Sequence, residues 1–278
     1  MSAPILELYP RAGTTRPLDG TYLSHALRGT GTVERPFVYA NFVSSLDGRI
    51  AVVEPETGES TVLEDLTSAH DWRLFQELQA QADCMVTHGA YLRAVGDGKF
   101  GDILQVGISE QARDLGRWRR DQRLTPQPAI AIVSRTLDFP LPPSLERHEQ
   151  PVHIITGNDA RMDRVASWRK RGYEVVFAGA GASVDGAPMI RALAARGYAH
   201  VYLLAGPQML AAVLRDHSLS RLYVTMTHQL IGGDVFHTMT TGPRFEAAGR
   251  LQLHSLYYDP VAPKGTGQWL ASFDVRTA

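Results

Sequence analysis

Cysteine is nearly absent from this chain, since Cys84 is the one cysteine among 278 residues. A lone thiol excludes both a disulfide framework and a cysteine-based metal site. Because Asp83 and Met85 flank it at the start of an apolar run, we expect a buried thiol rather than a nucleophile. No H-E-x-x-H motif occurs, and the ten histidines are scattered without ligand spacing. The sequence therefore predicts no metal site.

An excess of charge of either sign is also lacking. The 28 Lys and Arg residues nearly balance the 29 Asp and Glu residues, which gives a formal net charge of −1. This balance supplies no general attraction to nucleic acid or to an anionic membrane surface. The basic cluster Arg117-Trp118-Arg119-Arg120 is short and lies between Asp114 and Asp121. We expect it to be the solvated face of a helix.

Long hydrophobic runs are missing as well. No apolar stretch approaches the roughly 18 residues that span a bilayer. The first residues also lack the basic region and apolar core of a signal peptide. With 44% hydrophobic and 21% charged residues, the composition is that of an ordinary globular protein, and the expected location is the cytoplasm.

What the chain does contain is a regular alternation of short apolar runs with amphipathic segments. Strands are expected at residues 37–43, 83–87, 129–133, 152–156, 174–178, 200–204, 221–227 and 273–275. Helices are expected at residues 21–28, 66–82, 109–123, 160–171, 187–196 and 208–216. Such alternation predicts an α/β fold, with a mostly parallel central sheet, helices on both faces and an antiparallel C-terminal edge. We expect an N-terminal extension over residues 1–34 and one domain over residues 35–278.

The stretch 35–51, RPFVYANFVSSLDGRIA, is the centre of this organisation. Its apolar and aromatic first half is typical of a strand that is buried on both faces. The strand leads into the polar turn Ser44–Gly48, and a loop at a strand end is a common place for a site. Asp47 in this turn has two interpretations: it stabilises the turn through its own backbone, or it acts on a substrate.

Small and hydroxyl residues follow several other predicted strands. In an open α/β sheet the ligand binds at the carboxyl ends of the strands. The segments are Thr87-His88-Gly89, Ser134-Arg135-Thr136, Thr156-Gly157 and Ala205-Gly206-Pro207. Gly89 and Gly206 precede predicted helices, whose N–H groups can hold a phosphate, although glycine also serves tight turns for steric reasons alone. The absence of G-x-G-x-x-G, P-loop and G-x-S-x-G motifs excludes the standard dinucleotide, NTPase and hydrolase sites.

Together these segments resemble the reductase family typified by the C-terminal domain of the bifunctional riboflavin-biosynthesis deaminase/reductase, which has a dihydrofolate-reductase-like fold. The most specific match is Ser45-Leu46-Asp47-Gly48-Arg49-Ile50-Ala51. Further similarities, in the same order as in the family, are Ala82-Asp83-Cys84-Met85-Val86, Ile132-Val133-Ser134-Arg135-Thr136-Leu137, Val184-Asp185, Ala195-Arg196-Gly197, Gly206-Pro207 and Leu230-Ile231-Gly232-Gly233.

The resemblance implies an oxidoreductase that uses NADPH, acts on a small-molecule substrate and forms a homodimer. It implies that the pyrophosphate lies near Thr87, His88, Gly89, Ala205, Gly206, Pro207 and Gln208. Ser134 and Arg135 would bind the adenosine 2′-phosphate, because a hydroxyl and a cation suit a dianion. Thr156 ends a neighbouring strand and is assigned to the cofactor side.

The chain also departs from the family pattern on the substrate side. Asn41 stands where the family has lysine, and Leu204 stands where it has glutamate. These departures predict a small heterocyclic, carbonyl or imine substrate other than the phosphorylated pyrimidine of riboflavin synthesis. Asp47, Asn41 and Ser45 are the predicted catalytic residues. The alternative is a catalytically silent NADPH-binding dimer, and a reductase of a pterin-like or flavin-like ring would need an apolar slot near Phe42, Leu204 and Phe236.

Overall fold

The structure, a computed structural model, describes residues 3–53, 60–61, 66–245 and 249–275. Its strands are β1 (Ile5–Tyr9), β2 (Thr14–Arg16), β3 (Phe37–Ser45), β4 (Ala51–Val53), β5 (Ser60–Thr61), β6 (Cys84–His88), β7 (Ala129–Val133), β8 (Val152–Thr156), β9 (Glu174–Phe177), β10 (His200–Leu203), β11 (Arg221–Thr227), β12 (Phe236–His237), β13 (Leu251–Asp259) and β14 (Gln268–Val275). Its helices are α1 (Ala69–Ala80), α2 (Gly89–Gly96), α3 (Arg113–Asp121), α4 (Pro143–Arg147), α5 (Met162–Lys170), α6 (Gly186–Ala194) and α7 (Pro207–Arg215). None of these helices is long and apolar enough to cross a bilayer.

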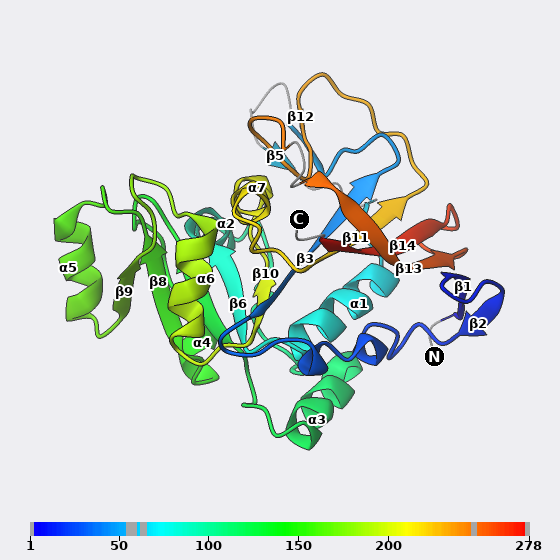
Figure 1. The fold of residues 1–278 in the computed structure, drawn as a ribbon, viewed down its shortest axis with the longest axis horizontal. Coiled ribbons are helices and arrows are strands. Elements are labelled where there is room, and N and C mark those ends of the chain that lie inside the picture. Colours follow the sequence, from blue (N-terminus) through cyan, green and yellow to red (C-terminus); the bar gives the residue numbers. More distant parts are fainter. Residues whose placement is uncertain (1–2, 54–59, 62–65, 246–248, 276–278) are drawn as a thin grey trace.

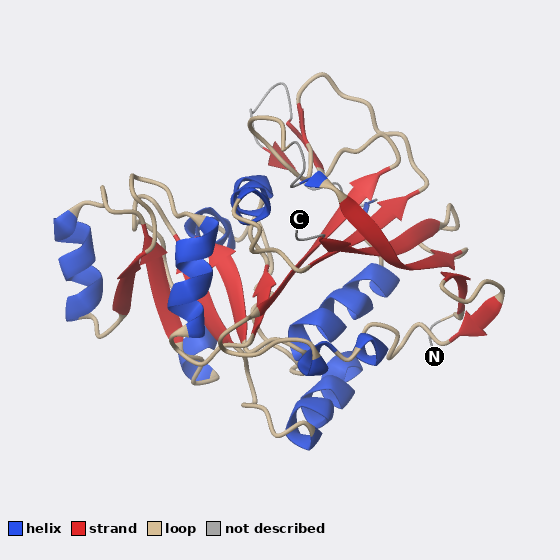
Figure 2. Cartoon of the chain, in the orientation of Figure 1, coloured by secondary structure: helices blue, strands red, loops and turns tan. Residues whose placement is uncertain are grey.

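One large sheet dominates the molecule (Figures 1 and 2). It has eleven strands in the order β2-β1-β13-β14-β11-β3-β10-β6-β7-β8-β9. Every neighbouring pair from β11 to β9 is parallel, whereas β14, β13, β1 and β2 pair in antiparallel fashion. The predicted α/β fold with an antiparallel edge is confirmed, and the N-terminal strands β1 and β2 extend that edge. A small second sheet has the order β12-β4-β5.

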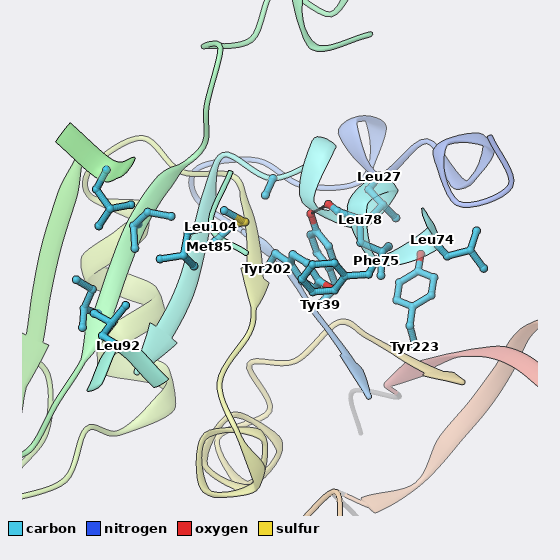
Figure 3. Close-up of a cluster of buried hydrophobic side chains, with 14 of the residues drawn as sticks. Leu27, Tyr39, Leu74, Phe75, Leu78, Met85, Leu92, Leu104, Tyr202 and Tyr223 are labelled. Atoms are coloured by element: carbon cyan, nitrogen blue, oxygen red, sulfur yellow. Dashed lines mark hydrogen bonds between the residues drawn. The ribbon is translucent and has the colours of Figure 1, made fainter. Parts of the chain in front are cut away.

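Helices cover both faces of the large sheet, as predicted. The side chains of Val38 and Ala40 pack on the face covered by α6 and α7, whereas Tyr39 packs on the face covered by α1. The rings of Tyr39 and Tyr202 stack with centroids 4.9 Å apart, beside Phe75 of α1 (Figure 3). This alternation assigns each functional side chain of β3, β10 and β11 to one face.

The predicted N-terminal extension packs against the rest of the chain. β1 pairs with β13, and the carboxylate of Glu77 in α1 accepts hydrogen bonds from the backbone N–H groups of Gly20, Tyr22 and Leu23. The helix predicted at residues 21–28 is wrong, because the chain forms two 3-10 turns, Leu23–His25 and Leu27–Gly29, separated by Ala26 with φ 48°. The N–H groups bound by Glu77 favour these short turns over one continuous helix.

Other elements differ from the prediction for local reasons. The helix predicted from Ser109 is wrong at its start: a 3-10 turn comes first and α3 begins only at Arg113, because the Ser109 side chain makes no capping hydrogen bond. The short helix α4 was missed because its prolines suggested a loop, although proline suits a first helical turn. β13 was also missed. The polar stretch Glu54–Ser60 also predicts a hairpin or loop, and residues 54–59 of it lie outside the described residues.

The basic cluster on α3 is only partly solvated, contrary to the expectation. Arg119 is completely buried, and its guanidinium donates to the carbonyl oxygens of Ala80, Ala82 and Thr125 at 2.8–2.9 Å. Burial lowers the pKa of Arg119 to about 10, so the group stays charged at neutral pH. A cation that satisfies three main-chain acceptors joins α3 to the end of α1.

Replacing Arg119 with alanine is therefore expected to lower the free energy of unfolding by about 3 kcal/mol, because three buried carbonyl groups lose their donor. Urea denaturation measures this change. The neighbouring Arg120 is exposed, so Arg120→Ala is the matched control and should change stability by less than about 0.5 kcal/mol. Equal effects of the two substitutions would contradict this role of Arg119.

Candidate functional site

The predicted site residues lie along one edge of the sheet. Parallel strands end at the same edge, and β11, β3, β10, β6, β7 and β8 are neighbours in that order. The predicted cofactor residues lie at the ends of β6 and β8 or just after β6, β7 and β10, and the predicted catalytic residues lie on or just after β3. The topology thus brings together segments that are far apart in the sequence.

The turn after β3 is closed by its own side chains. The Ser45 hydroxyl donates to the Asp47 carboxylate and accepts from the backbone N–H of Arg49 at 3.0 Å. The guanidinium of Arg49 donates to the Asp47 carboxylate at 2.7 Å. The backbone N–H groups of Ile231 and Gly232 donate to the same oxygen. Asp47 therefore joins the end of β3 to the loop that follows β11.

These contacts determine the charge of Asp47. The hydrogen bond from Ser45, together with those from Gly232 and Ile231 and the charge of Arg49, lowers the pKa of Asp47 to about 2. The carboxylate is ionised at neutral pH and carries no proton to deliver. This geometry fits a turn-stabilising or orienting group, and the catalytic assignment of Asp47 and of the fully buried Ser45 stays a prediction.

β3 extends beyond its neighbour at the substrate side. β10 ends at Leu203, which lies opposite Ala40, whereas β3 continues to Ser45. Residues 41–43 are half-exposed, although residues 38–40 of the same strand are buried. The Asn41 side chain lies at this step and accepts a hydrogen bond from the hydroxyl of Tyr202. This uncovered part is where a molecule can reach the carboxyl half of β3.

Asp71 is a candidate functional residue that the sequence reasoning missed. It lies in the first turn of α1, is 7% exposed, and accepts a hydrogen bond from the Thr225 hydroxyl at 2.6 Å. Thr225 pairs with Val43, so the carboxyl group lies beside the uncovered part of β3. Burial raises the pKa of Asp71 to about 6, against the opposing effect of the Thr225 bond. A carboxyl group of this kind can hold a proton near neutral pH.

The sequence held only a misleading signal for Asp71. Ser68 caps α1, and its hydroxyl accepts from the backbone N–H of Asp71 at 3.1 Å. The pattern Ser-x-x-Asp is typical of the first turn of a helix and predicts a capping role. The carboxyl group instead contacts a strand 154 residues away in the sequence.

The turn between β6 and α2 lies against Ser134. The ring nitrogen Nδ1 of His88 accepts from the backbone N–H of Tyr91 at 3.2 Å, and burial lowers the pKa of His88, which leaves a neutral imidazole. A Cβ atom added at Gly89 would lie 3.0 Å from the Ser134 hydroxyl oxygen. Glycine therefore favours this close approach of β6–α2 to the end of β7, because any larger residue would have to displace the Ser134 side chain slightly.

A second helix begins beside it. Gly206 is the N-cap of α7, Pro207 occupies the first turn, and Gln208 is exposed, while Ala205 before them is buried. Because β10 and β6 are neighbours, the N-termini of α7 and α2 both lie at this edge. His88 occupies the N–H of Tyr91 and Pro207 has no N–H, but the dipoles of both helices favour an anionic ligand here.

Two hydroxyl groups at the ends of β6 and β8 have no partner within the described chain. The side-chain oxygens of Thr87 and Thr156 are buried and make no hydrogen bond. A buried hydroxyl without a partner costs about 1–3 kcal/mol. Buried hydroxyl groups without a partner are uncommon in native proteins. A ligand that shifts the edge of the sheet on binding, and then forms a hydrogen bond with these groups, would explain them.

Arg135 contributes to a cationic depression beyond β7 and β8. This depression has a volume of about 370 Å³ and is lined by Arg135, Thr136, Asp138, Asp159, Arg161 and Arg164. Arg161 and Arg164 each reach an exposed aspartate, at 2.6 and 3.4 Å respectively. Arg135 is predicted from the sequence, whereas these two arginines are not, because they lie in and before α5 rather than at the end of a strand.

The apolar slot expected near Phe42, Leu204 and Phe236 is not formed by these three side chains. Phe42 packs against the cluster on the α6 and α7 face, whereas Leu204 packs against the cluster on the α1 face. Phe236 lies on the small sheet, where the guanidinium of Arg49 covers its ring at 4.2 Å. These three side chains therefore do not line one slot.

Comparisons with known proteins agree with this arrangement. A family model described as the RibD C-terminal domain matches residues 36–260. A search of curated proteins by sequence gave no match. Among solved structures, a pyrimidine reductase-like protein of Corynebacterium diphtheriae has a TM-score of 0.63 and 18% identity, over 87% of this chain and 93% of that chain.

Two further structures share the fold. RibD of Acinetobacter baumannii has a TM-score of 0.57 and 16% identity, over 90% of this chain and 60% of that chain. The riboflavin biosynthesis reductase of Saccharomyces cerevisiae has a TM-score of 0.53 and 14% identity, over 92% of this chain and 96% of that chain. The predicted dihydrofolate-reductase-like fold is confirmed. Because the family model covers the chain from the start of β3 to the end of β13, this protein belongs to the RibD C-terminal domain family.

Proposed function

We propose that this protein is an NADPH-dependent reductase of a small heterocyclic, carbonyl or imine substrate. One observation carries the proposal: a buried carboxyl group, an uncovered stretch of β3 and two helix N-termini lie along the same edge of the sheet. The arrangement offers a place for an anionic cofactor beside a place for a substrate. Family membership supports the reductase class.

The residues of the cofactor side fit a dinucleotide. The N-termini of α2 and α7 would bind the pyrophosphate, with Gly89 and Gly206 leaving room for it. Thr87 and Thr156, whose hydroxyls have no partner within the described chain, would gain one from the ligand. Arg135 and the arginines beside it would bind the 2′-phosphate that distinguishes NADPH from NADH.

The remaining chemistry requires a proton. Bound NADPH supplies a hydride. The heteroatom next to the reduced carbon must receive a proton, and Asp71 is the candidate donor because burial keeps its pKa near 6. Asn41 would orient a neutral polar group of the substrate through its side-chain amide.

The substrate is proposed to differ from that of the riboflavin enzymes. Asn41 and Leu204 are both half-exposed on the α1 face, and neither is ionic. Charge-assisted hydrogen bonds contribute about 1.5–3 kcal/mol each, so a charged substrate would lose such contacts at these two positions. A neutral ring or imine that lies against Val43 and Leu204 fits better.

A catalytically silent NADPH-binding protein is the second candidate. The state of Asp47, the one acid of the Ser45–Ala51 motif, favours this candidate. Its carboxylate is ionised and already bound by Arg49 and by the backbone of residues 231–232, so it has no proton to give to a substrate. In either case a homodimer is expected, and light scattering during size-exclusion chromatography tests it.

Calorimetric titration with NADPH and NADH tests the cofactor assignment. We expect NADPH to bind at least about 10-fold more tightly, because one charge-assisted contact to the 2′-phosphate is worth more than 1.4 kcal/mol. Arg135→Ala should weaken NADPH binding by about 10-fold or more and leave NADH binding unchanged. Arg117→Ala removes an exposed arginine on α3 and is the control for net charge. If neither nucleotide binds, the reductase proposal is abandoned.

A further inference from the structure

The N-terminal arm, residues 3–34, lies before the segment matched by the family model, yet it brings Tyr22 near enough to Asp71 for the two groups to interact electrostatically. Tyr22 is 3% exposed and belongs to the same buried cluster as Phe75 and Tyr202. Its ring lies 4.8 Å from the ring of Tyr223, centroid to centroid. Tyr223 lies two residues before Thr225 on the same face of β11, and Thr225 is the hydrogen-bond partner of Asp71.

The position of Tyr22 is fixed on both sides of its backbone by α1. The carboxylate of Glu77 accepts from the N–H of Tyr22 at 2.9 Å, and the amide of Gln81 donates to its carbonyl oxygen at 2.9 Å. His25 packs against the Tyr22 ring at 5.3 Å. Such contacts define where the ring points, although the arm is not part of a regular helix.

The hydroxyl of Tyr22 does not explain why the residue is held so firmly. It is buried and has no hydrogen-bond partner within the described chain, although a buried tyrosine usually finds one. Burial raises the pKa of Tyr22 well above its ordinary value, and the nearby charges of Tyr223 and Asp71 contribute in the same direction. The ring, rather than a hydrogen bond, is therefore what Tyr22 contributes near Asp71.

We propose that the N-terminal arm is part of the active site, and that Tyr22 is a positioning residue that excludes water from the inner side of Asp71 and so keeps a proton on its carboxyl group. The inference rests on the role of Asp71 given above. The arm would thus contribute to the reaction without touching the substrate.

The groups that face Asp71 are consistent with this role. The charge of Asp71 contributes to the raised pKa of Tyr202 of β10 and of Tyr22 of the arm. Each of these tyrosines is therefore a neutral phenol at physiological pH. Thr225 of β11 is the one side chain that lowers the pKa of Asp71, and no cation acts on it within the described residues. Glu77, on the same helix, is bound by Arg73 and by the arm. Exclusion of water is therefore the main reason that this carboxyl group holds a proton.

Two substitutions separate the ring of Tyr22 from its hydroxyl. Tyr22→Ala should admit water to Asp71 and return the pKa of its carboxyl group toward the ordinary value near 4. The inflection of the pH–rate profile should move to lower pH by the same number of pH units. At neutral pH this shift of about two pKa units corresponds to a loss of turnover of about 100-fold, which is recovered at lower pH. Tyr22→Phe keeps the ring and should retain both the inflection and the rate. If Tyr22→Ala does not fold, Tyr22→Val takes its place with the same expectation.

A second readout needs no substrate, so it separates this inference from the proposed function. The side-chain carboxyl carbon of Asp71 is followed by ¹³C NMR in aspartate-labelled protein, and its resonance is identified by its absence from Asp71→Asn. A titration midpoint that falls in Tyr22→Ala and stays unchanged in Tyr22→Phe supports the inference, even if no substrate is turned over. An unchanged midpoint in Tyr22→Ala, or an equal fall in both variants, overturns it.

Discussion

Replacing Asp71 with asparagine is expected to reduce turnover by about 100- to 10,000-fold, the usual contribution of a general acid. Asparagine has nearly the same shape and can still bind the Thr225 hydroxyl, but it has no acidic proton. NADPH affinity should remain, because the cofactor residues follow other strands. Steady-state kinetics and calorimetry on the same preparation measure the two quantities separately.

The pH dependence follows from the direction of the pKa shift. If protonated Asp71 donates the proton, the rate should rise as the pH falls toward 6 and level off below it. Thr225→Val removes the hydrogen bond that lowers this pKa, so the inflection should move to higher pH. In Asp71→Asn the inflection should disappear.

Asp71→Asn should change stability in the opposite sense to activity, although the stability and the activity of the native protein both fall as the pH rises through 6. The folded pKa of Asp71, about 6, lies above its ordinary value of 3.8. Its contribution to folding is therefore fully present below the unfolded pKa and is lost as the pH rises through the folded pKa. Above that range the buried charge costs about 2–3 kcal/mol, so Asp71→Asn should be more stable than the native protein at neutral pH by up to this amount.

Asp47→Asn is the matched comparison, because Asp47 is the other candidate acid. The carboxylate of Asp47 is ionised and bound by Arg49 and by backbone N–H groups, so this substitution should loosen the turn and leave the inflection near pH 6 in place. Loss of that inflection in Asp47→Asn, with an unchanged profile in Asp71→Asn, would assign the proton to Asp47 instead.

A chain that lacks residues 1–34 is not expected to fold. The arm buries Ile5, Leu18, Tyr22 and Leu27 almost completely in the cluster on the α1 face. At about 1.5–3 kcal/mol for each side chain, these contacts contribute about 6–12 kcal/mol. That is comparable with the entire stability of a typical domain, about 5–15 kcal/mol. Removal of the arm would also leave Glu77 buried without its three backbone partners.

Circular dichroism and urea denaturation of residues 35–278 measure this effect. Removal of residues 1–4 alone is the control and should be nearly neutral, because β1 begins at Ile5. Cooperative unfolding of residues 35–278, together with native NADPH affinity, would contradict this expectation and show that the arm is a separate extension.

Local sequence patterns account for the framework of this protein. β7, β8 and β11 have the predicted bounds, because each is a short apolar run between residues that interrupt regular structure. Gly172 and Gly197 end α5 and α6 with positive φ, as expected from glycine after a helix. The turn after β3 and the glycine-containing turns after β6 and β10 follow from the same local patterns and from the family resemblance.

The partners of the buried polar groups depend on tertiary contacts that no local pattern predicts. Arg119 belongs to a basic run that predicts exposure, yet it binds the end of α1, and Asp71 belongs to a capping pattern, yet it binds β11. Tyr22 has no pattern of its own and is located by Glu77, 55 residues later in the sequence. Periodicity records which residues face a core, but it does not record which distant group completes a buried hydrogen bond. Those pairings arise when strands and helices that are far apart in sequence meet, and at this edge of the sheet they determine which acid can hold a proton.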